Sequence, residues 1–271
     1  MTRARVSGVA TFREQQVRFA FDQDVPRVNR VVRERQLEVV GGVPLDEWAR
    51  PSRCPGWSVH DVVRHVAQMN EMVVGVAAAA RVGERYHRAR RFDPRTTPSE
   101  WLAEAPAADP EETLAAYAQS TGAVVEAGGA LGADVLVGTP VGLQVWPRMV
   151  LHALFDAVVH ERDVTEPLGR SAPAIPEQLP VVAYVLLVAA RVACAVDREF
   201  AVTLDVGGQV LSVSVHGADV EVVPAERNAT APVPADPLPL LDGLSGRVPL
   251  DEVLAAPDDV RAALGILARS M

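Results

Sequence analysis

Two histidines and one aspartate recur at four-residue intervals in the segment LHALFDAVVHERD, at His152, Asp156 and His160. This spacing predicts that all three lie on one face of a helix, each rotated by about 40° from the one before. A carboxylate and an imidazole one turn apart can ligate the same metal ion. A further ligand must come from another helix, and His65 lies beside the apolar stripe of an amphipathic segment. The alternative interpretation is that these residues are solvated or hydrogen-bonded polar groups within a bundle.

Arginine carries every fixed positive charge on a side chain, because all 26 residues in the lysine-plus-arginine count are arginines. The absence of lysine excludes a Schiff base on a side chain and the lysine of a phosphate-binding loop. A guanidinium instead binds carboxylates in a planar fork. Six arginines between residues 81 and 95 follow the segment that holds His65, and we expect them either to be solvated or to rim its pocket.

The composition narrows the possible partners and the compartment. A net charge of −9 and 5% aromatic residues argue against binding to nucleic acid. The longest uninterrupted apolar run, Val181 to Ala190, is too short to cross a bilayer, and the first residues do not form an apolar leader, so no membrane association is expected. Cys54 and Cys194 are the only cysteines, which favours a reducing cytoplasm. Because no histidine neighbours Cys54 in the sequence, we expect it to be a packed structural thiol.

Helical patterns dominate the first 170 residues. A capping-box pattern at Ser58 and Asp61 starts the clearest of them, and Pro26 interrupts the earliest. The glycines that follow residue 127 predict a loop. Four helices joined in this way predict a bundle. The predicted helices cover residues 11–39, 58–82, 109–127 and 147–164.

The pattern changes after about residue 170. One apolar helix is expected over 177–196, before two alternating runs that flank Gly207-Gly208 and predict a hairpin. A third strand at 219–223 and a final helix at 256–268 follow. We therefore predict an α+β fold, with a four-helix bundle over residues 1–170 and a small α/β domain with a linking helix over residues 171–271.

Three sequence motifs resemble those of the mycothiol-dependent maleylpyruvate isomerases, whose N-terminal domain is a DinB-like four-helix bundle. The motifs are RPSRCPGWSVHDVVRHVAQ at 50–68, HALFDAVVHERDV at 152–164 and PLLDGLSGRVPLDEV at 239–253. Together they extend over most of the chain. The resemblance implies a zinc-binding bundle followed by a small C-terminal domain.

Carried over to this chain, the resemblance implies that His65, Asp156 and His160 are the ligands of zinc or another divalent metal. Asp156 replaces the glutamate that is usual in the family. The low-molecular-weight thiol mycothiol would bind at the open position of the metal. Arg247, as a catalytic and cofactor-binding residue, would hold a substrate carboxylate, and His152 would line the same cofactor pocket. Asp61 and Asp163 would be hydrogen-bond partners of the metal-binding histidines or, equally, surface and capping residues.

The expected function is a thiol-dependent isomerase or S-transferase acting on a small, electrophilic and anionic substrate such as maleylpyruvate. One alternative is a zinc-dependent hydrolase that uses a metal-bound water at the same position. Another is a non-enzymatic bundle that binds a small ligand, with structural histidines. The sequence gives no indication of the oligomeric state.

Overall fold

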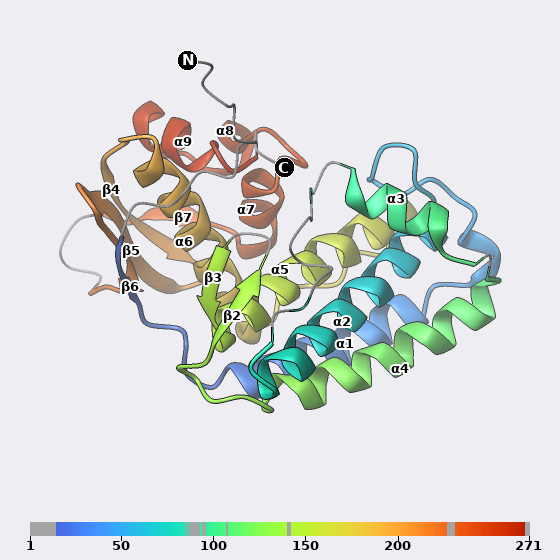
Figure 1. Cartoon of the computed structure of the whole chain (residues 1–271). Coiled ribbons are helices and arrows are strands. Elements are labelled where there is room, and N and C mark those ends of the chain that lie inside the picture. Colours follow the sequence, from blue (N-terminus) through green and yellow to red (C-terminus); the bar gives the residue numbers. More distant parts are fainter. Residues whose placement is uncertain are drawn as a thin grey trace, which may run out of the picture.

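The computed structural model describes residues 15–84, 86, 93, 96–106, 108–139, 142–226 and 231–268. A helical bundle forms one side of the molecule, and a sheet covered by short helices forms the other (Figure 1). The α+β fold predicted from the sequence is therefore confirmed.

The bundle consists of four long helices, as predicted. The helices α2 and α5 contact each other, α4 packs against α2, α1 packs against α5, and α1 and α4 also contact each other. The short helix α3 (Thr97–Glu104) lies over α2. The bundle helices are α1 (Val25–Gly41), α2 (Val59–Arg81), α4 (Pro110–Gly128) and α5 (Trp146–Thr165).

Two capping boxes fix where α2 and α4 begin. Ser58 Oγ accepts a hydrogen bond from the Asp61 amide at 3.2 Å, and Asp61 Oδ2 accepts one from the Ser58 amide at 3.0 Å. Asp109 and Glu112 make the same reciprocal pair at the start of α4. Each box satisfies amides that the first turn of a helix leaves without partners. Because α2 starts at a fixed residue, the position of His65 along the bundle is also fixed.

The first described segment differs from the sequence prediction. Residues 11–39 were expected to form a broken helix, but Gln16–Phe19 is a strand, β1, that pairs in parallel with β6 of the C-terminal sheet. The helix α1 begins only at Val25, with Pro26 in its first turn, where a proline is tolerated. The four-residue strand is stabilised by a partner about 200 residues away in the sequence, a pairing that local spacing does not reveal.

The C-terminal sheet has the strand order β1-β6-β5-β4-β7. The predicted hairpin is confirmed, since β4 and β5 are antiparallel and joined by Gly207 and Gly208, whose φ angles of 57° and 91° are those that a tight hairpin turn requires. The predicted third strand is also present, as β6. Besides β1, the strands of this sheet are β4 (Phe200–Val206), β5 (Gln209–His216), β6 (Asp219–Pro224) and β7 (Val233–Ala235).

A second hairpin, formed by β2 (Leu136–Thr139) and β3 (Gly142–Val145), lies in the segment that the sequence predicted as a glycine-rich loop. It contacts α2 and leads directly into α5. Val137 and Gln144 are buried in this hairpin, while Leu136 and Leu143 are exposed. The strands are too short, and their alternation too weak, to be recognised among four nearby glycines.

The helix α6 (Leu179–Ala195) joins the bundle to the sheet, because it contacts α5 on one side and β5 and β6 on the other. One apolar core continues from α1 through α6 to the last helix. The window Pro176–Ala195 has a hydropathy of 1.8 and is long enough to cross a membrane, but 67% of it is buried inside the protein, as in a core helix.

Short helices complete the C-terminal part and cover α6 and the sheet. The predicted final helix is shorter than expected, ending at Leu264. In the described part of the chain, single-turn 3-10 helices also lie at Leu45–Glu47, Glu166–Leu168 and Pro176–Gln178. The short C-terminal helices are α7 (Pro237–Leu244), α8 (Leu250–Val253) and α9 (Asp258–Leu264).

Candidate metal centre

The structure brings His65 of α2 together with Asp156 and His160 of α5, the three residues expected to ligate a metal. Asp156 Oδ1 lies 3.8 Å from His65 Nε2 and 3.5 Å from His160 Nε2. The two imidazole rings meet edge to face, with centroids 4.9 Å apart. Each residue offers one potential ligand atom, and these three atoms all lie within 4.8 Å of one another.

The hydrogen bonds around this triad leave donor atoms free to bind a cation. His160 Nδ1 lies 2.9 Å from Asp163 Oδ2, so a proton on Nδ1 is held there and the Nε2 lone pair faces Asp156 Oδ1. Two acceptors in this position repel each other unless a proton or a metal ion lies between them. Asp156 Oδ2 and His65 Nδ1 are buried and make no hydrogen bond with any residue in the described part of the chain.

The spacing and chemistry of the triad fit zinc. Ligand atoms bound tetrahedrally at zinc–nitrogen and zinc–oxygen distances of about 2.0–2.1 Å lie about 3.3 Å apart. The separations of 3.5 and 3.8 Å from Asp156 to the two histidines are slightly longer than this. Three protein ligands are also the number found at catalytic zinc sites, which keep a fourth position open. A small inward movement of the three side chains would complete the coordination.

The charges within the triad are strongly coupled. Burial by itself lowers the pKa of His160, but the carboxylates of Asp156 and Asp163 raise that pKa well above its usual value. Burial acts in the opposite direction on Asp156, whose pKa is nevertheless held well below its usual value by His160 and His65. Burial lowers the pKa of His65 and keeps it neutral. In the metal-free protein, a proton on His160 therefore balances the Asp156 carboxylate, and a bound cation would replace this proton.

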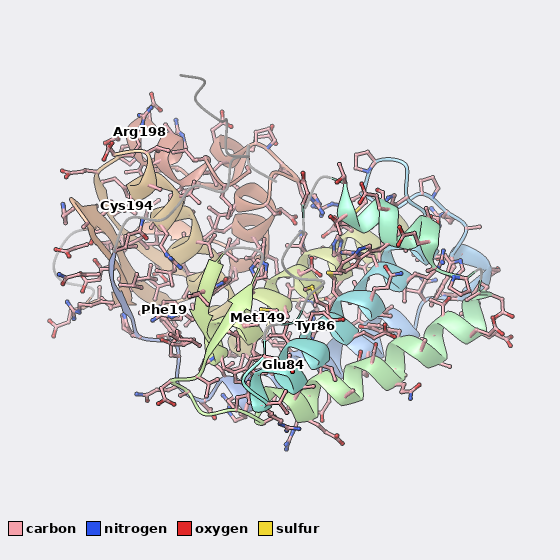
Figure 2. All side chains as sticks on the ribbon, in the orientation of Figure 1. Phe19, Glu84, Tyr86, Met149, Cys194 and Arg198 are labelled. Atoms are coloured by element: carbon pink, nitrogen blue, oxygen red, sulfur yellow. The ribbon has the colours of Figure 1, made fainter. Side chains whose placement is uncertain are left out.

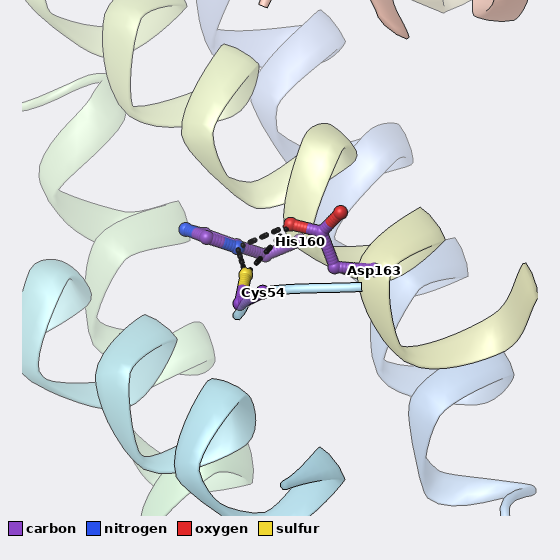
Figure 3. Close-up of side chains that lie close together, drawn as sticks. All are labelled: Cys54, His160 and Asp163. Carbon is purple, nitrogen blue, oxygen red and sulfur yellow. Dashed lines mark hydrogen bonds and ion pairs between the residues drawn. The ribbon is translucent and has the colours of Figure 1, made fainter. Parts of the chain in front are cut away.

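Cys54 lies against the Nδ1 side of the His160 ring (Figure 3), whereas Asp156 lies on the Nε2 side. Its Sγ is 3.1 Å from Asp163 Oδ2 and 3.7 Å from His160 Nδ1. The chain reaches this position through a turn in which Gly56 has a φ of 80° and the Trp57 amide bonds to the Cys54 carbonyl at 3.0 Å. Cys54 was interpreted as a structural thiol because no histidine lies near it in the sequence. In the fold it contacts His160 and lines the pocket beside the metal centre.

Cys54, His160 and Asp163 also lie close enough together to hold a metal ion. The charge of Asp163 is already used, however, because Arg247 donates to both of its oxygens, from Nε at 2.9 Å and from Nη2 at 2.8 Å. A cation at this position would be repelled by the Arg247 guanidinium. The cluster of His65, Asp156 and His160 contains no such competing charge and is therefore the better candidate.

Arg247 reaches Asp163 from the loop that follows α7. Its amide bonds to the Asp242 carbonyl at 2.8 Å, and Gly246 before it adopts a φ of 75° against Ala268, where a side chain would be strained. The ion pair raises the pKa of Arg247 despite burial and lowers that of Asp163 despite burial. The C-terminal part of the chain thereby supplies a residue beside the candidate metal centre.

A cavity of about 360 Å³ opens beside the triad. This volume lies within the range that is usual for pockets binding small molecules. His152 and Arg247, both expected to contact a cofactor, line the cavity together with His65, Asp156 and His160. Met149, near the start of α5 and labelled in Figure 2, also lines it.

His152 is held in one orientation. Tyr184 Oη donates to Gln144 Oε1 at 3.3 Å and lies 3.2 Å from His152 Nδ1, which places a proton on Nδ1 of the histidine. Burial lowers the pKa of His152, so the ring is neutral. Asp61, by contrast, caps α2 through Ser58 rather than bonding to His65. Of the six arginines between residues 81 and 95, all but Arg81 lie outside the described residues.

Comparison with known proteins agrees with this geometry. The family model of the mycothiol maleylpyruvate isomerase N-terminal domain matches residues 29–165. The crystal structures of the mycothiol-dependent maleylpyruvate isomerase and of its histidine-to-alanine mutant each align with a TM-score of 0.61 and 14% sequence identity, over 87% of this chain and 94% of theirs, which shows the same fold. A comparison with curated protein sequences finds no match. Because the family model matches half of the chain, including every residue of the triad, the chain belongs to the mycothiol maleylpyruvate isomerase family.

Proposed function

We propose that this protein is a zinc-dependent enzyme that uses mycothiol to isomerise a small electrophile or to form a thioether with it. The observation that carries the proposal is the triad of His65, Asp156 and His160, whose potential ligand atoms lie within 4.8 Å of one another beside a cavity. Membership of the mycothiol maleylpyruvate isomerase family supports the choice of thiol and of reaction class. Maleylpyruvate, the substrate named for the structural relatives, is the first compound to test.

The side chains around the triad have separable tasks in this proposal. His65, Asp156 and His160 would hold the zinc, which lowers the pKa of a thiol bound to it so that the thiolate prevails at neutral pH. Asp163 keeps the His160 ring in the orientation that directs Nε2 toward Asp156.

The two remaining pocket residues would contact the thiol or the substrate. Arg247 Nη1 makes no hydrogen bond with a described residue, so it is available to donate to a carbonyl or hydroxyl oxygen. His152, with its proton on Nδ1, presents an unprotonated Nε2 as an acceptor. Each assignment follows from the position of the residue on the cavity wall.

In the isomerase reaction the thiol adds across the conjugated double bond of the substrate. The remaining single bond then rotates, and elimination returns the thiol with the opposite geometry at the restored double bond. In an S-transferase reaction the adduct is released without elimination. The two outcomes therefore differ only in whether the thiol is recovered.

Metal analysis of the purified protein and its variants tests the proposal. We expect near-stoichiometric zinc in the wild type and loss of zinc in His65→Ala and His160→Ala. The control His216→Ala should keep its zinc, because His216 is exposed on β5 and is not part of the triad. Turnover of maleylpyruvate, and of a panel of other electrophiles, should require both zinc and mycothiol. Zinc that survives both substitutions would refute the metal centre. Turnover that needs zinc but no thiol would instead indicate the hydrolase alternative.

A cytoplasmic location fits the same proposal, because mycothiol serves as a reduced thiol. Cys54 and Cys194 are both buried and do not form a disulfide with each other, as expected of a protein in a reducing compartment.

A further inference from the structure

The cavity beside the triad changes from polar to apolar along its length. The helices α2 and α5 run in opposite directions, because His65 near the start of α2 meets His160 near the end of α5. Moving away from the triad, the residues of α2 that line the cavity are Met69, Met72 and Val73. From His65 to Val73 the axial distance is about 12 Å, at a rise of about 1.5 Å per residue.

The other two walls of this end of the cavity are mostly apolar. Met149 and Ala153 line it from α5, where the neutral imidazole of His152 is the one polar group between them, and Val185 and Val188 line it from α6. These side chains surround a space that is long enough for an aryl group or a short alkyl chain beside the triad. A pocket with one polar end and an apolar body selects ligands with the same division.

At the polar end, the charges of the described arginine side chains are balanced by carboxylates. Arg247 is the one arginine among the described residues that line the cavity, and its guanidinium is paired with the fully buried carboxylate of Asp163. Behind it, each remaining guanidinium of the network is also paired with a carboxylate at 3.0 Å or less. The network consists of the guanidiniums of Arg53, Arg162 and Arg247 and the carboxylates of Asp163, Asp242 and Glu166.

Among the described residues of the cavity, a substrate carboxylate would therefore find no free cation to pair with. Lysine is absent from the chain, so only an arginine could supply one. The net charge of a divalent ion bound by the Asp156 carboxylate and a thiolate is also zero. Moving an unpaired carboxylate from water into an apolar pocket is strongly unfavourable.

We propose that the substrate of this site is an uncharged electrophile with an apolar body, such as an α,β-unsaturated ketone or aldehyde that carries an aryl or alkyl group. The electrophilic character rests on the proposed function, whereas the preference for an uncharged body follows from the cavity. The thiol sulfur forms a bond to the β-carbon as the carbon–carbon π bond breaks, and the thiol proton is transferred to the α-carbon. The carbonyl oxygen of the substrate accepts a hydrogen bond from Arg247 Nη1, and its apolar body lies between α2, α5 and α6.

Binding of two unreactive, saturated ketones to the zinc-loaded protein tests this preference without any need for turnover. One probe is 4-phenylbutan-2-one, and the other is the same molecule with a carboxylate in the para position of the ring. Trp57 lines the cavity, so tryptophan fluorescence reports occupancy, and calorimetry gives an independent measurement. We expect the neutral ketone to bind at least tenfold more tightly. Equal affinity, tighter binding of the carboxylate or no binding of either ketone would overturn the proposal.

Substitution of Met72 locates the bound molecule. Met72→Gln keeps the length of the side chain but places an amide in the apolar end, and we expect it to weaken binding of the neutral ketone about fivefold or more. Met72→Leu is the matched control and should stay within about twofold of the wild type. Unchanged affinity in a folded Met72→Gln protein, checked by its thermal melting, would place the ligand elsewhere and overturn the assignment.

The failure of this inference is distinguishable from failure of the proposed function. The unsaturated ketone 4-phenylbut-3-en-2-one, supplied with mycothiol, measures turnover. Preferential binding of the neutral ketone without turnover of any electrophile would contradict the enzymatic proposal and leave the ligand class supported. Turnover of maleylpyruvate together with tighter binding of the carboxylate would support the enzymatic proposal and contradict the inferred ligand class.

Discussion

Replacing Asp163 by asparagine removes one negative charge from the buried group around His160 while nearly preserving the shape of the side chain. Asp163 is fully buried and accepts hydrogen bonds from His160, Arg247 and Cys54. Removing one partner of a buried ion pair costs about 3–5 kcal/mol. Because the Arg247 side chain is 24% exposed, water offsets part of this cost. We therefore expect the free energy of unfolding to fall by about 2–3 kcal/mol.

The same substitution should weaken zinc binding. A neutral amide holds the Nδ1 proton of His160 less strongly than a carboxylate does, so the ring is less firmly directed toward Asp156 and its Nε2 is a weaker ligand. Loss of such a hydrogen-bond partner typically reduces metal affinity by about 10–100-fold. Competition with a chromophoric chelator at fixed pH measures this affinity, and urea unfolding followed by tryptophan fluorescence measures the stability.

Asp242→Asn is the matched control. Asp242 is buried in the same network of arginines and pairs with Arg53 and Arg162, but it does not contact His160. The Asp242→Asn variant should therefore lose stability to a similar extent, while its zinc affinity stays within about twofold of the wild type. Wild-type affinity in Asp163→Asn, or an equal loss of affinity in both variants, would refute the role assigned to Asp163.

Three further predictions concern the start of α2, the acid stability and the metal. Ser58→Ala removes the cap of α2 and should lower the free energy of unfolding by about 1 kcal/mol in urea titrations, whereas an unchanged value would contradict the capping role. Arg162 and Arg53 hold the pKa of Asp242 below its usual 3.8 despite burial. Between the lowered pKa and the usual one, the folded protein therefore binds fewer protons than the unfolded chain. The stability from this ion pair should be present above about pH 4 and be lost as the pH falls through the lowered pKa. Unfolding curves between pH 3 and 6 should show a shallower acid slope for Asp242→Asn, and equal slopes would argue against this ion pair. Finally, chelation of the metal should lower the melting temperature of the wild type but not that of His160→Ala, because an ion that binds only the folded state stabilises it.

Much of the helical bundle could be predicted from local sequence. The capping residues Ser58 and Asp109 determine where α2 and α4 begin, and both helices start where their sequence patterns predicted. The four-residue spacing of Asp156 and His160 likewise placed them on one face of α5. Such features depend on backbone geometry within a few turns, which a single sequence contains.

The segments that were predicted incorrectly depend on distant partners. Gln16–Phe19 forms a strand because β6 offers a free edge, although its own residues are also compatible with a helix. The hairpin of β2 and β3 is similarly stabilised by packing against α2 and α5. The tendency of a short segment to form a strand is decided mainly by its neighbours in the sheet and the core.

The sequence by itself determined the kinds of chemistry available to this protein: three side chains of metal-ligating type on two amphipathic helices, and arginine as the source of fixed positive charge. Only the tertiary structure decided how these groups are used. It brought Cys54 against His160, 106 residues away, and paired Arg247 with Asp163 across 84 residues. Local spacing carries no information about such contacts, because they form where separate elements pack together. The same packing determines whether an arginine faces a substrate with its charge free or already balanced by a buried carboxylate.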